Sequence, residues 1–435
     1  MRGSFPSIQI SQKLYRTGKS LPLHIAHFQA GFPVPDGTTT AVHGLSLGLA
    51  RQGLAVTIYG CGLERDLERM PAHPNVQVHL FRKLSRRGFS VPEALLDRLK
   101  RNGDNIDLLV INTMFNPPNL AVAQAARKGR IPYVVSPHDP YHPGLLAKNG
   151  IRKRIYTAFF ERRLVRRAAA VQVLSPEHTR YLDRFGVRTA LVIPNGFSAE
   201  DYSALAEETR AVPTQLHGDP CFLCLGRLDA HHKGLDLLIR GFARARRAGV
   251  LPETAMINFV GRDNGDLPAL RRIAAAEQVS DRLNFTGRVS DRTRRAMLHA
   301  CDVLLLCSRY DGFGLVALEA MLAAKPVVVS NQAGISTWVE KAEAGILAEP
   351  SAAGIEAALT ECMKRKNEWR TLGCNGRSFA RCRLTWDQVA QHAARCYSEL
   401  LSTLPHSARR HEPMRVIGLP KSEDFESERM APKWL

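Results

Sequence analysis

Short β-rich runs of residues alternate with helical patterns along most of this chain, and this alternation constrains the fold more than any other feature. In the first half, strands are expected at residues 23–28, 55–59, 107–111 and 132–135, with a helix at 39–52. The alternation then restarts, with strands at 221–225, 255–260, 282–285, 303–307 and 326–330 and helices at 235–248, 267–277, 291–300 and 315–324. Such a pattern predicts an α/β fold built from parallel sheets with helices on both faces.

The chain has 435 residues, which is too long for one ordinary core, so two domains of about 200 residues each are expected. The sequence predicts Rossmann-like domains at 21–200 and 221–385, joined by a polar linker at 201–220. An amphipathic helix at 386–402 follows, and the segments 1–20 and 403–435 are expected to be flexible tails. Ligands of doubly wound sheets bind at the carboxyl ends of the strands, so the crevice between the domains is the expected site.

The charge balance narrows the range of partners. The chain has 60 Lys and Arg against 41 Asp and Glu, a formal net charge of +19. Nucleic acid, an anionic membrane surface or an anionic substrate would each be attracted to such a chain. Because no nucleic-acid-binding module is recognisable, nucleic acid is the least favoured of these partners.

The apolar residues and the cysteines indicate the compartment. No uninterrupted apolar stretch approaches the roughly 20 residues that span a bilayer, and no apolar segment of a signal peptide follows the basic residues near the start. Among the nine cysteines, Cys221 and Cys224 form one C-x-x-C motif whose side chains would point to opposite faces of a strand. No second cysteine pair completes a zinc site. We therefore expect a cytoplasmic protein without a metal or a disulfide scaffold.

A basic loop follows the first strand of the second domain. Gly226-Arg227-Leu228 comes directly after the strand, and Lys233-Gly234 follows in the same loop. A departing nucleoside diphosphate carries about two negative charges, which a fixed Arg and Lys can neutralise without a metal. A solvated basic loop is the alternative interpretation of these residues.

A glycine-containing loop later in the second domain is a second candidate. Ser308 to Leu315 includes Asp311-Gly312-Phe313-Gly314 and continues into a helix that contains Glu319. A strand, a glycine loop and a helix N-terminus together form an anion site. Asp311 and Glu319 are placed to face one pocket, one near a sugar and the other near the ribose hydroxyls. An ordinary strand-to-helix turn is the alternative.

The same glycines also fit a dinucleotide-binding fingerprint, Gly312-x-Gly314-x-x-Ala317. That fingerprint requires an acidic residue about 20 positions further on, at the end of the next strand. The next strand ends in Val329-Ser330-Asn331, which has no carboxylate. A dehydrogenase is therefore disfavoured.

The first domain offers two weaker motifs. Asp36-Gly37 lies between the first strand and the first helix, where a glycine lets the backbone approach a ligand at the helix N-terminus. His138, within Ser136-Pro137-His138-Asp139, follows a later strand and could donate a hydrogen bond to a sugar hydroxyl or a phosphate. Each has a structural alternative: any tight turn for the first, and a structural histidine for the second.

The segment 152–167 combines seven basic residues with one acidic residue, Glu161. Its apolar residues fall on one helical stripe: Ile155, Tyr156, Phe159, Phe160 and Leu164. We expect this stripe to pack on the sheet, and we also consider contact with an anionic membrane surface. A lipid-linked or polyanionic acceptor would account for the same charge.

The ordered set of motifs resembles the family 4 glycosyltransferases, which have the two-domain GT-B fold. The resemblance covers roughly residues 22–402 and rests on four stretches: Ile193-Pro194-Asn195-Gly196, Gly226-Arg227-Leu228 with Lys233-Gly234-Leu235-Asp236, Phe285-Thr286-Gly287-Arg288-Val289, and Asp311-Gly312-Phe313-Gly314-Leu315 with Glu319-Ala320. It implies two Rossmann-like domains that face each other across a cleft, with the helix at 386–402 crossing back to the first domain. It also implies retention of configuration at the anomeric carbon and no bound divalent metal.

Residue roles follow from the same resemblance. Arg227 and Lys233 would bind the donor diphosphate together with the helix N-terminus at Gly314-Leu315, while Glu319 would hold the ribose. Arg288-Val289 would lie near the nucleobase, and His138 near the transferred sugar. The candidate catalytic residues are Asp311, His138, Arg227 and Lys233, and the candidate donor-binding residues are Asp36, Gly37, Asn195, Gly226, Arg288, Val289, Gly312, Phe313, Gly314, Leu315 and Glu319.

Two residues depart from the family pattern. Asp311 stands where the family has Glu, and Asp36 stands where the family has the first Gly of a pair. We expect a glycosyltransferase that moves a hexose-type sugar from a nucleotide diphosphate sugar to a glycan or lipid-linked acceptor, in surface polysaccharide or glycolipid biosynthesis. A sugar-nucleotide epimerase, a phosphorylase of the same architecture and an inactive binding relative are the alternatives.

Overall fold

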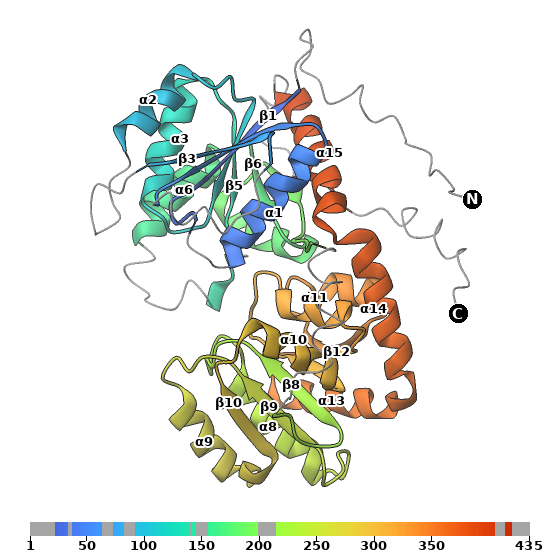
Figure 1. Ribbon diagram of the computed structural model, residues 1–435. Coiled ribbons are helices and arrows are strands. Elements are labelled where there is room, and N and C mark those ends of the chain that lie inside the picture. The colour runs from blue at the N-terminus through green and yellow to red at the C-terminus, as the bar shows by residue number, and fades with distance from the viewer. Residues whose placement is uncertain are drawn as a thin grey trace, which may run out of the picture.

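The computed structural model describes residues 22–33, 37–62, 73–81, 92–139, 141–144, 155–198, 215–404 and 414–419. These residues form two separate parallel sheets, each covered by helices on both faces, stacked one above the other in Figure 1. This arrangement confirms the predicted α/β fold with two Rossmann-like domains. The predicted tail at 1–20 and most of the predicted linker at 201–220 lie outside the described residues.

The first sheet has eight parallel strands among the described residues, in the order β14-β7-β6-β5-β4-β1-β2-β3. Its strands are β1 (His24–Gln29), β2 (Ala55–Gly60), β3 (Val76–Leu80), β4 (Leu108–Asn112), β5 (Tyr133–Ser136), β6 (Ala170–Val173), β7 (Thr189–Val192) and β14 (Arg415–Ile417). The strand order reverses between β1 and β4, which are neighbours in the sheet. A crevice for ligands opens at the carboxyl ends of the strands at such a reversal.

Helices cover both faces of this sheet, and their buried residues fall into two separate hydrophobic clusters. One face carries α2 (Glu93–Arg101), α3 (Pro118–Lys128) and α6 (Arg162–Arg166). The other face carries α1 (Gly37–Arg51) and the long C-terminal helix α15 (Trp386–Thr403).

The second sheet repeats the same plan with six parallel strands, in the order β10-β9-β8-β11-β12-β13. Its strands are β8 (Cys221–Leu225), β9 (Met256–Val260), β10 (Leu283–Gly287), β11 (Val303–Leu306), β12 (Val327–Ser330) and β13 (Gly345–Ala348). One face is covered by α8 (Leu235–Arg247), α9 (Leu267–Ala276) and α13 (Ala352–Lys364), and the other by α10 (Asp291–Ala300), α11 (Leu315–Leu322), α12 (Ser336–Lys341) and α14 (Trp369–Arg383). Its order reverses between β8 and β11, the strands that precede the two candidate loops.

The C-x-x-C motif lies in β8, as predicted, with its two side chains on opposite faces of the sheet. Cys221 packs in the cluster under α11, and Cys224 packs in the cluster under α8. Burial raises the pKa of the Cys221 thiol to about 11 and that of Cys224 to about 12. Both residues therefore behave as small apolar side chains near neutral pH.

The chain passes between the domains twice, and Phe197, which precedes the first passage, pairs with residues of the second passage. Phe197 N donates to Leu384 O at 3.0 Å, and Trp386 N donates to Phe197 O at 2.9 Å. Directly after this bridge, α15 leaves the second domain and runs along α1 of the first domain (Figure 1). The predicted return helix is confirmed.

Two glycines on α1 allow α15 to pack closely. A Cβ atom added to Gly44 would lie 2.2 Å from the Trp386 ring, and one added to Gly48 would lie 2.5 Å from the Trp386 carbonyl oxygen. Trp386 is buried at this crossing, with its ring against Gly44 and its carbonyl group against Gly48.

The C-terminal segment differs from the sequence prediction at one place. Arg415–Ile417, within the predicted flexible tail at 403–435, forms strand β14 and pairs in parallel with β7. A three-residue edge strand is too short to give a period-two signal in the sequence. It is stabilised by its pairing with β7 at the edge of the first sheet, to which α15 returns the chain. Residues 405–413 and 420–435 lie outside the described part of the chain.

The basic segment at 152–167 also differs from its prediction. Leu164 and Val165 are buried, but Ile155, Phe159 and Phe160 are exposed and do not pack on the sheet. Residues Thr157–Glu161 form a π-helix before α6. A π-helical turn is wider than an α-helical turn, so it interrupts the 3.6-residue period on which the predicted stripe rests. As a result Glu161 and Leu164 are buried, while Phe159 and Phe160 are exposed. Residues 152–154 lie outside the described residues.

The packing of α1 on α15 gives a direct prediction. Helix propensity alone would make Gly44→Ala more stable by about 1 kcal/mol. Because the added methyl group would clash with Trp386, we expect Gly44→Ala to lower the free energy of unfolding by about 1–3 kcal/mol in chemical denaturation. The control is Gly31→Ala, where no atom lies within 4 Å of the added Cβ. Equal stability of the two variants would contradict the close helix crossing.

Candidate functional site

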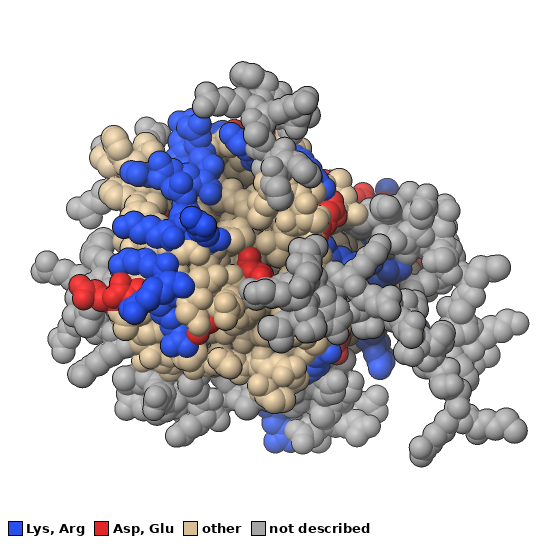
Figure 2. Space-filling view, turned by 90° about the horizontal axis from the view of Figure 1, so that it is seen from above, with Lys and Arg blue, Asp and Glu red and all other residues tan. Residues whose placement is uncertain are grey.

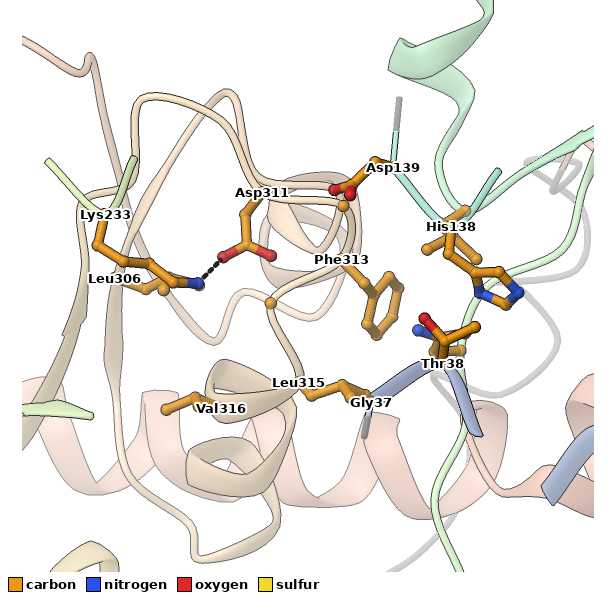
Figure 3. Close-up of a pocket in the computed structure, with 14 residues that line it drawn as sticks. Gly37, Thr38, His138, Asp139, Lys233, Leu306, Asp311, Phe313, Leu315 and Val316 are labelled. Atoms are coloured by element: carbon orange, nitrogen blue, oxygen red, sulfur yellow. Dashed lines mark hydrogen bonds and ion pairs between the residues drawn. The ribbon is translucent and has the colours of Figure 1, made fainter. Parts of the chain in front are cut away.

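A cavity of about 350 Å³ lies between the two domains, at the carboxyl ends of both sheets (Figure 3). Its walls come from the loops that follow β5, β6, β7, β8 and β11 and from the N-termini of α1 and α11. The lining residues are Gly37, Thr38, His138, Asp139, Leu174, Asn195, Lys233, Leu306, Asp311, Gly312, Phe313, Gly314, Leu315 and Val316.

Lys233 and Asp311 form an ion pair at the cavity wall. The Lys233 side chain points toward Asp311 in Figure 3, and the distance from Nζ to Oδ2 is 2.6 Å. Burial lowers the pKa of Lys233, but the adjacent Asp311 carboxylate outweighs burial and leaves the pKa raised. Burial likewise raises the pKa of Asp311, and the Lys233 ammonium outweighs it and leaves that pKa lowered. Both groups are therefore charged near neutral pH.

A second ion pair fixes the same two loops behind the cavity. Arg309 Nη1 donates to Asp236 Oδ1 at 2.7 Å, and Nη2 donates to Oδ2 at 2.8 Å. Arg309 Nη1 also donates to the carbonyl oxygen of His231 at 2.9 Å. A two-pronged contact of this kind sets orientation as well as distance. It holds the loop that carries Lys233 against the loop that carries Asp311.

Two helix N-termini meet at the cavity. Gly314 precedes α11 with a φ of +95°, and a Cβ atom there would lie 2.7 Å from a methyl carbon of Leu306. Only glycine fits this backbone conformation and this space. Across the cavity, a Cβ on Gly37 at the start of α1 would lie 3.8 Å from Leu315 Cδ1. The N–H groups at the start of a helix and the helix dipole favour an anion, and both helices begin at this cavity.

His138 is positioned by the first domain. Asn112, at the end of β4, donates from Nδ2 to the carbonyl oxygens of Phe28 and Val110, each at 3.2 Å, so its Oδ1 faces the histidine. His138 Nε2 lies 2.9 Å from this Oδ1 and therefore carries the proton that is donated. The His138 backbone has a φ of +60°, a strained conformation for a non-glycine residue and one that concentrates at functional sites.

The domains touch beside the cavity. A Cβ atom on Gly312 would lie 2.2 Å from the carbonyl oxygen of His138, so the second domain approaches the first through a glycine. The Tyr310 ring stacks between His232 of its own domain, at 4.5 Å, and His142 of the first domain, at 5.0 Å. Both domains thus contribute walls to the cavity.

The structure brings together nine of the predicted site residues at this cavity: Gly37, His138, Asn195, Lys233, Asp311, Gly312, Phe313, Gly314 and Leu315. Gly226 and Arg227 line a small adjoining hollow, which Lys233 also lines. Arg288, Val289 and Glu319 line neither space. Asp36 lies outside the described residues.

The residues outside the cavity have other surroundings. Arg288 is exposed, and Val289 packs against the core of the second domain. Glu319 on α11 forms an ion pair with Arg294 on α10. Burial lowers the pKa of Arg294, and the Glu319 carboxylate outweighs this effect and raises it. Sequence reasoning missed Arg294 because it lies in a run of arginines on an otherwise ordinary helix.

Glu161 is a second residue that sequence reasoning did not place. It is 1% exposed and accepts hydrogen bonds from Tyr141 Oη at 2.6 Å and from Phe115 N at 3.3 Å. Burial raises the pKa of its carboxyl group to about 7. Tyr141 belongs to the loop that also carries His138 and Asp139, so Glu161 anchors one wall of the cavity. Asp139, which the sequence pattern does not single out, also lines that cavity.

Among the described residues, no three His, Cys, Asp or Glu side chains are grouped closely enough to hold a metal ion. Nor does any helix in the described ranges have the length and apolar character needed to cross a membrane.

Both halves of the chain match sequence profiles of known protein families. Residues 206–379 match the sequence profile of the glycosyl transferases group 1, and residues 36–196 match that of the glycosyl transferase 4-like domain. Mannosylfructose-phosphate synthase of Agrobacterium fabrum is 30% identical over 210 residues, which cover 46% of this chain and 45% of that enzyme. The chain therefore matches about half of the length of this relative.

Two solved structures share the fold across both domains. Sucrose-phosphate synthase from Thermosynechococcus elongatus superposes with a TM-score of 0.62 at 21% identity, covering 88% of this chain and 100% of that chain. The Anabaena protein HepE, solved in complex with UDP and glucose, has a TM-score of 0.61, the same identity and the same coverage.

The raised pKa of Glu161 predicts how stability depends on pH. The folded protein holds the proton of the Glu161 carboxyl group more tightly than the unfolded chain does. The contribution of this group to stability is therefore fully present below the unfolded pKa of about 4.3 and is lost as pH rises through about 7. We expect the free energy of unfolding of the wild type to fall, relative to Glu161→Gln, by about 3 kcal/mol at most between pH 5 and pH 8. Urea unfolding across that range measures the difference. A constant difference would show that folding does not raise the pKa of Glu161.

Proposed function

Because this chain belongs to the family 4 glycosyltransferases of the GT-B fold, we propose that it moves a hexose-type sugar from a nucleotide diphosphate sugar to a glycan or lipid-linked acceptor. The observation that carries the proposal is the charged Lys233, fixed by Asp311 at the wall of a cavity that both domains enclose. Two helix N-termini open onto the same space, so one end of the cavity suits a diphosphate.

The proposed chemistry centres on the leaving group. As the bond between the anomeric carbon and the diphosphate oxygen breaks, negative charge grows on the diphosphate. The Lys233 ammonium and the N–H groups at the start of α11 stabilise this charge, and their positions are fixed before the reaction begins. Arg227, in the adjoining hollow, supplies a second cation. These groups belong to the protein itself, so we propose transfer without a divalent metal.

Asp311 has a positioning role in this proposal. Its Oδ2 already accepts the hydrogen bond from Lys233 Nζ, and it also lies 3.4 Å from Ser308 Oγ. A carboxylate held in this way orients the ammonium group toward the phosphates. We therefore do not assign Asp311 as a nucleophile, and we propose that transfer proceeds with retention at the anomeric carbon.

The first domain supplies the sugar and acceptor side of the site. His138, with its ring orientation fixed by Asn112, is proposed to contact the transferred sugar. Glu319 and the Arg288-Val289 segment are proposed to act on the ribose and the base. For Glu319 this requires exchange of its Arg294 contact or sharing of the carboxylate between Arg294 and the ribose.

Substrate class and compartment complete the proposal. The fold neighbour that binds UDP and glucose supports a nucleoside diphosphate hexose as donor. We propose a role in surface polysaccharide or glycolipid biosynthesis, at the cytoplasmic side of the membrane. The nine free cysteines are compatible with a reducing compartment.

A thermal-shift panel of UDP-, GDP- and ADP-sugars tests the donor site. At least one of the three nucleotides should raise the melting temperature of the wild type. Loss of a charge-assisted hydrogen bond removes about 1.5–3 kcal/mol, so Lys233→Gln should weaken that nucleotide's Kd by roughly 10- to 100-fold, with a smaller effect for Arg227→Gln.

The matched control is Arg271→Gln on α9, an exposed cation away from the cavity, which should bind nucleotide like the wild type. A wild type that no nucleotide stabilises, or a Lys233→Gln variant with unchanged affinity, would refute the proposed site.

A further inference from the structure

Few large apolar side chains are exposed in the described part of the chain, and most of those few lie together. Four large apolar residues are exposed there, and three of them lie within six positions: Ile155 at 53%, Phe159 at 67% and Phe160 at 46%. We call these three side chains the apolar ridge. They stand on the π-helix and the turn before it, at the outer face of the first domain.

Cations surround the apolar ridge. Arg162, Arg163, Arg166 and Arg167 follow it directly, and all four are exposed; we call them the basic patch. The one acidic residue of the segment, Glu161, points inward and is buried. On the neighbouring α3, Arg127 and Lys128 are also exposed. Seen from above, Lys and Arg side chains gather along the side of the first domain on which α2 and α3 lie (Figure 2).

We propose that the apolar ridge and the basic patch form a docking surface for an anionic lipid bilayer. The ridge would enter the boundary between head groups and acyl chains, and the arginines would contact head-group phosphates. Docking itself does not depend on the enzyme's reaction. Only the inference that it brings the enzyme to a membrane-linked acceptor rests on the proposed function.

The chemistry of the surface favours lipid over two other occupants. A second copy of the chain, docked through the same ridge, would bring two basic patches together and would be opposed by like-charge repulsion. Duplex nucleic acid would satisfy the arginines, but its surface of phosphates and sugars offers nothing apolar for the Ile155 side chain. A bilayer with anionic head groups satisfies both parts at once.

The docking surface is linked to the cavity by buried contacts. Glu161 follows Phe160 directly and holds Tyr141, in the loop that carries His138. The Tyr156 ring packs edge-on against Phe115, with 6.1 Å between ring centroids, and Phe115 packs in the same way against Tyr141 at 6.3 Å. A docked protein would therefore hold the acceptor side of the cavity close to the membrane, with the donor domain farther away.

Sedimentation with vesicles tests the proposal. The wild type should sediment with phosphatidylcholine vesicles that contain phosphatidylglycerol and should bind pure phosphatidylcholine vesicles much more weakly. Each cation near an anionic surface contributes about 1 kcal/mol, so Arg162→Gln combined with Arg163→Gln should lower the partition coefficient about 30-fold. Phe159→Ser combined with Phe160→Ser should lower it roughly tenfold or more.

Matched controls test whether vesicle binding requires the apolar ridge and the basic patch or only exposed charge and apolar surface anywhere on the chain. Arg271→Gln with Arg272→Gln removes an exposed arginine pair from α9 of the second domain, and Leu419→Ser removes the fourth exposed apolar side chain. Both controls should sediment like the wild type, and every variant should keep its thermal shift with the donor nucleotide.

The outcomes distinguish the two proposals. Failure of the wild type to bind anionic vesicles, with the nucleotide shift intact, overturns the docking surface and leaves the donor site standing. Equal loss of vesicle binding in the controls also overturns it. If gel filtration shows a dimer that Phe159→Ser with Phe160→Ser dissociates, and vesicles do not bind, the face is an interface between copies.

Discussion

The ion pair between Lys233 and Asp311 is the contact on which the site depends, because it places a fixed positive charge at the wall of the cavity between the domains. A lysine alone there would carry a large desolvation cost, and Asp311 compensates for it at 2.6 Å. The Arg309–Asp236 pair repeats the connection behind it, between the same two loops. Reciprocal pairs of this kind hold the loops after β8 and β11 at a fixed separation, so a diphosphate would meet a charge that is already oriented.

The rest of the architecture brings the first domain to this charge. Both sheets reverse their strand order, at β1 and β4 in one and at β8 and β11 in the other, and the carboxyl ends at these two points face each other. α15 maintains the arrangement because it belongs to the second domain by sequence but packs on α1 through Gly44 and Gly48. Gly312 then permits contact with the His138 carbonyl, and the cavity is enclosed between them.

The sequence predicts the second domain well because its elements have clear periods and its loops have distinctive residues. The strand at 221–225 and the helix at 291–300 have the predicted bounds, and Lys233, Asp311 and Gly314 line one cavity. The sequence does not predict local structure that depends on contacts between distant segments of the chain. β14 exists only because a sheet edge lies beside it, and the π-helix turns Phe159 and Phe160 outward while Glu161 turns inward. Pairings between distant residues, such as Glu319 with Arg294 and Tyr141 with Glu161, leave no local signal.

A crystal structure with the bound nucleoside diphosphate of the preferred donor would show whether Lys233 holds the leaving group. We expect the distal phosphate to lie within hydrogen-bonding distance of Lys233 Nζ and of backbone N–H groups at the start of α11, in the cavity between the domains. A nucleotide bound elsewhere, or one whose phosphates point away from Lys233 while its base fills the cavity, would contradict it.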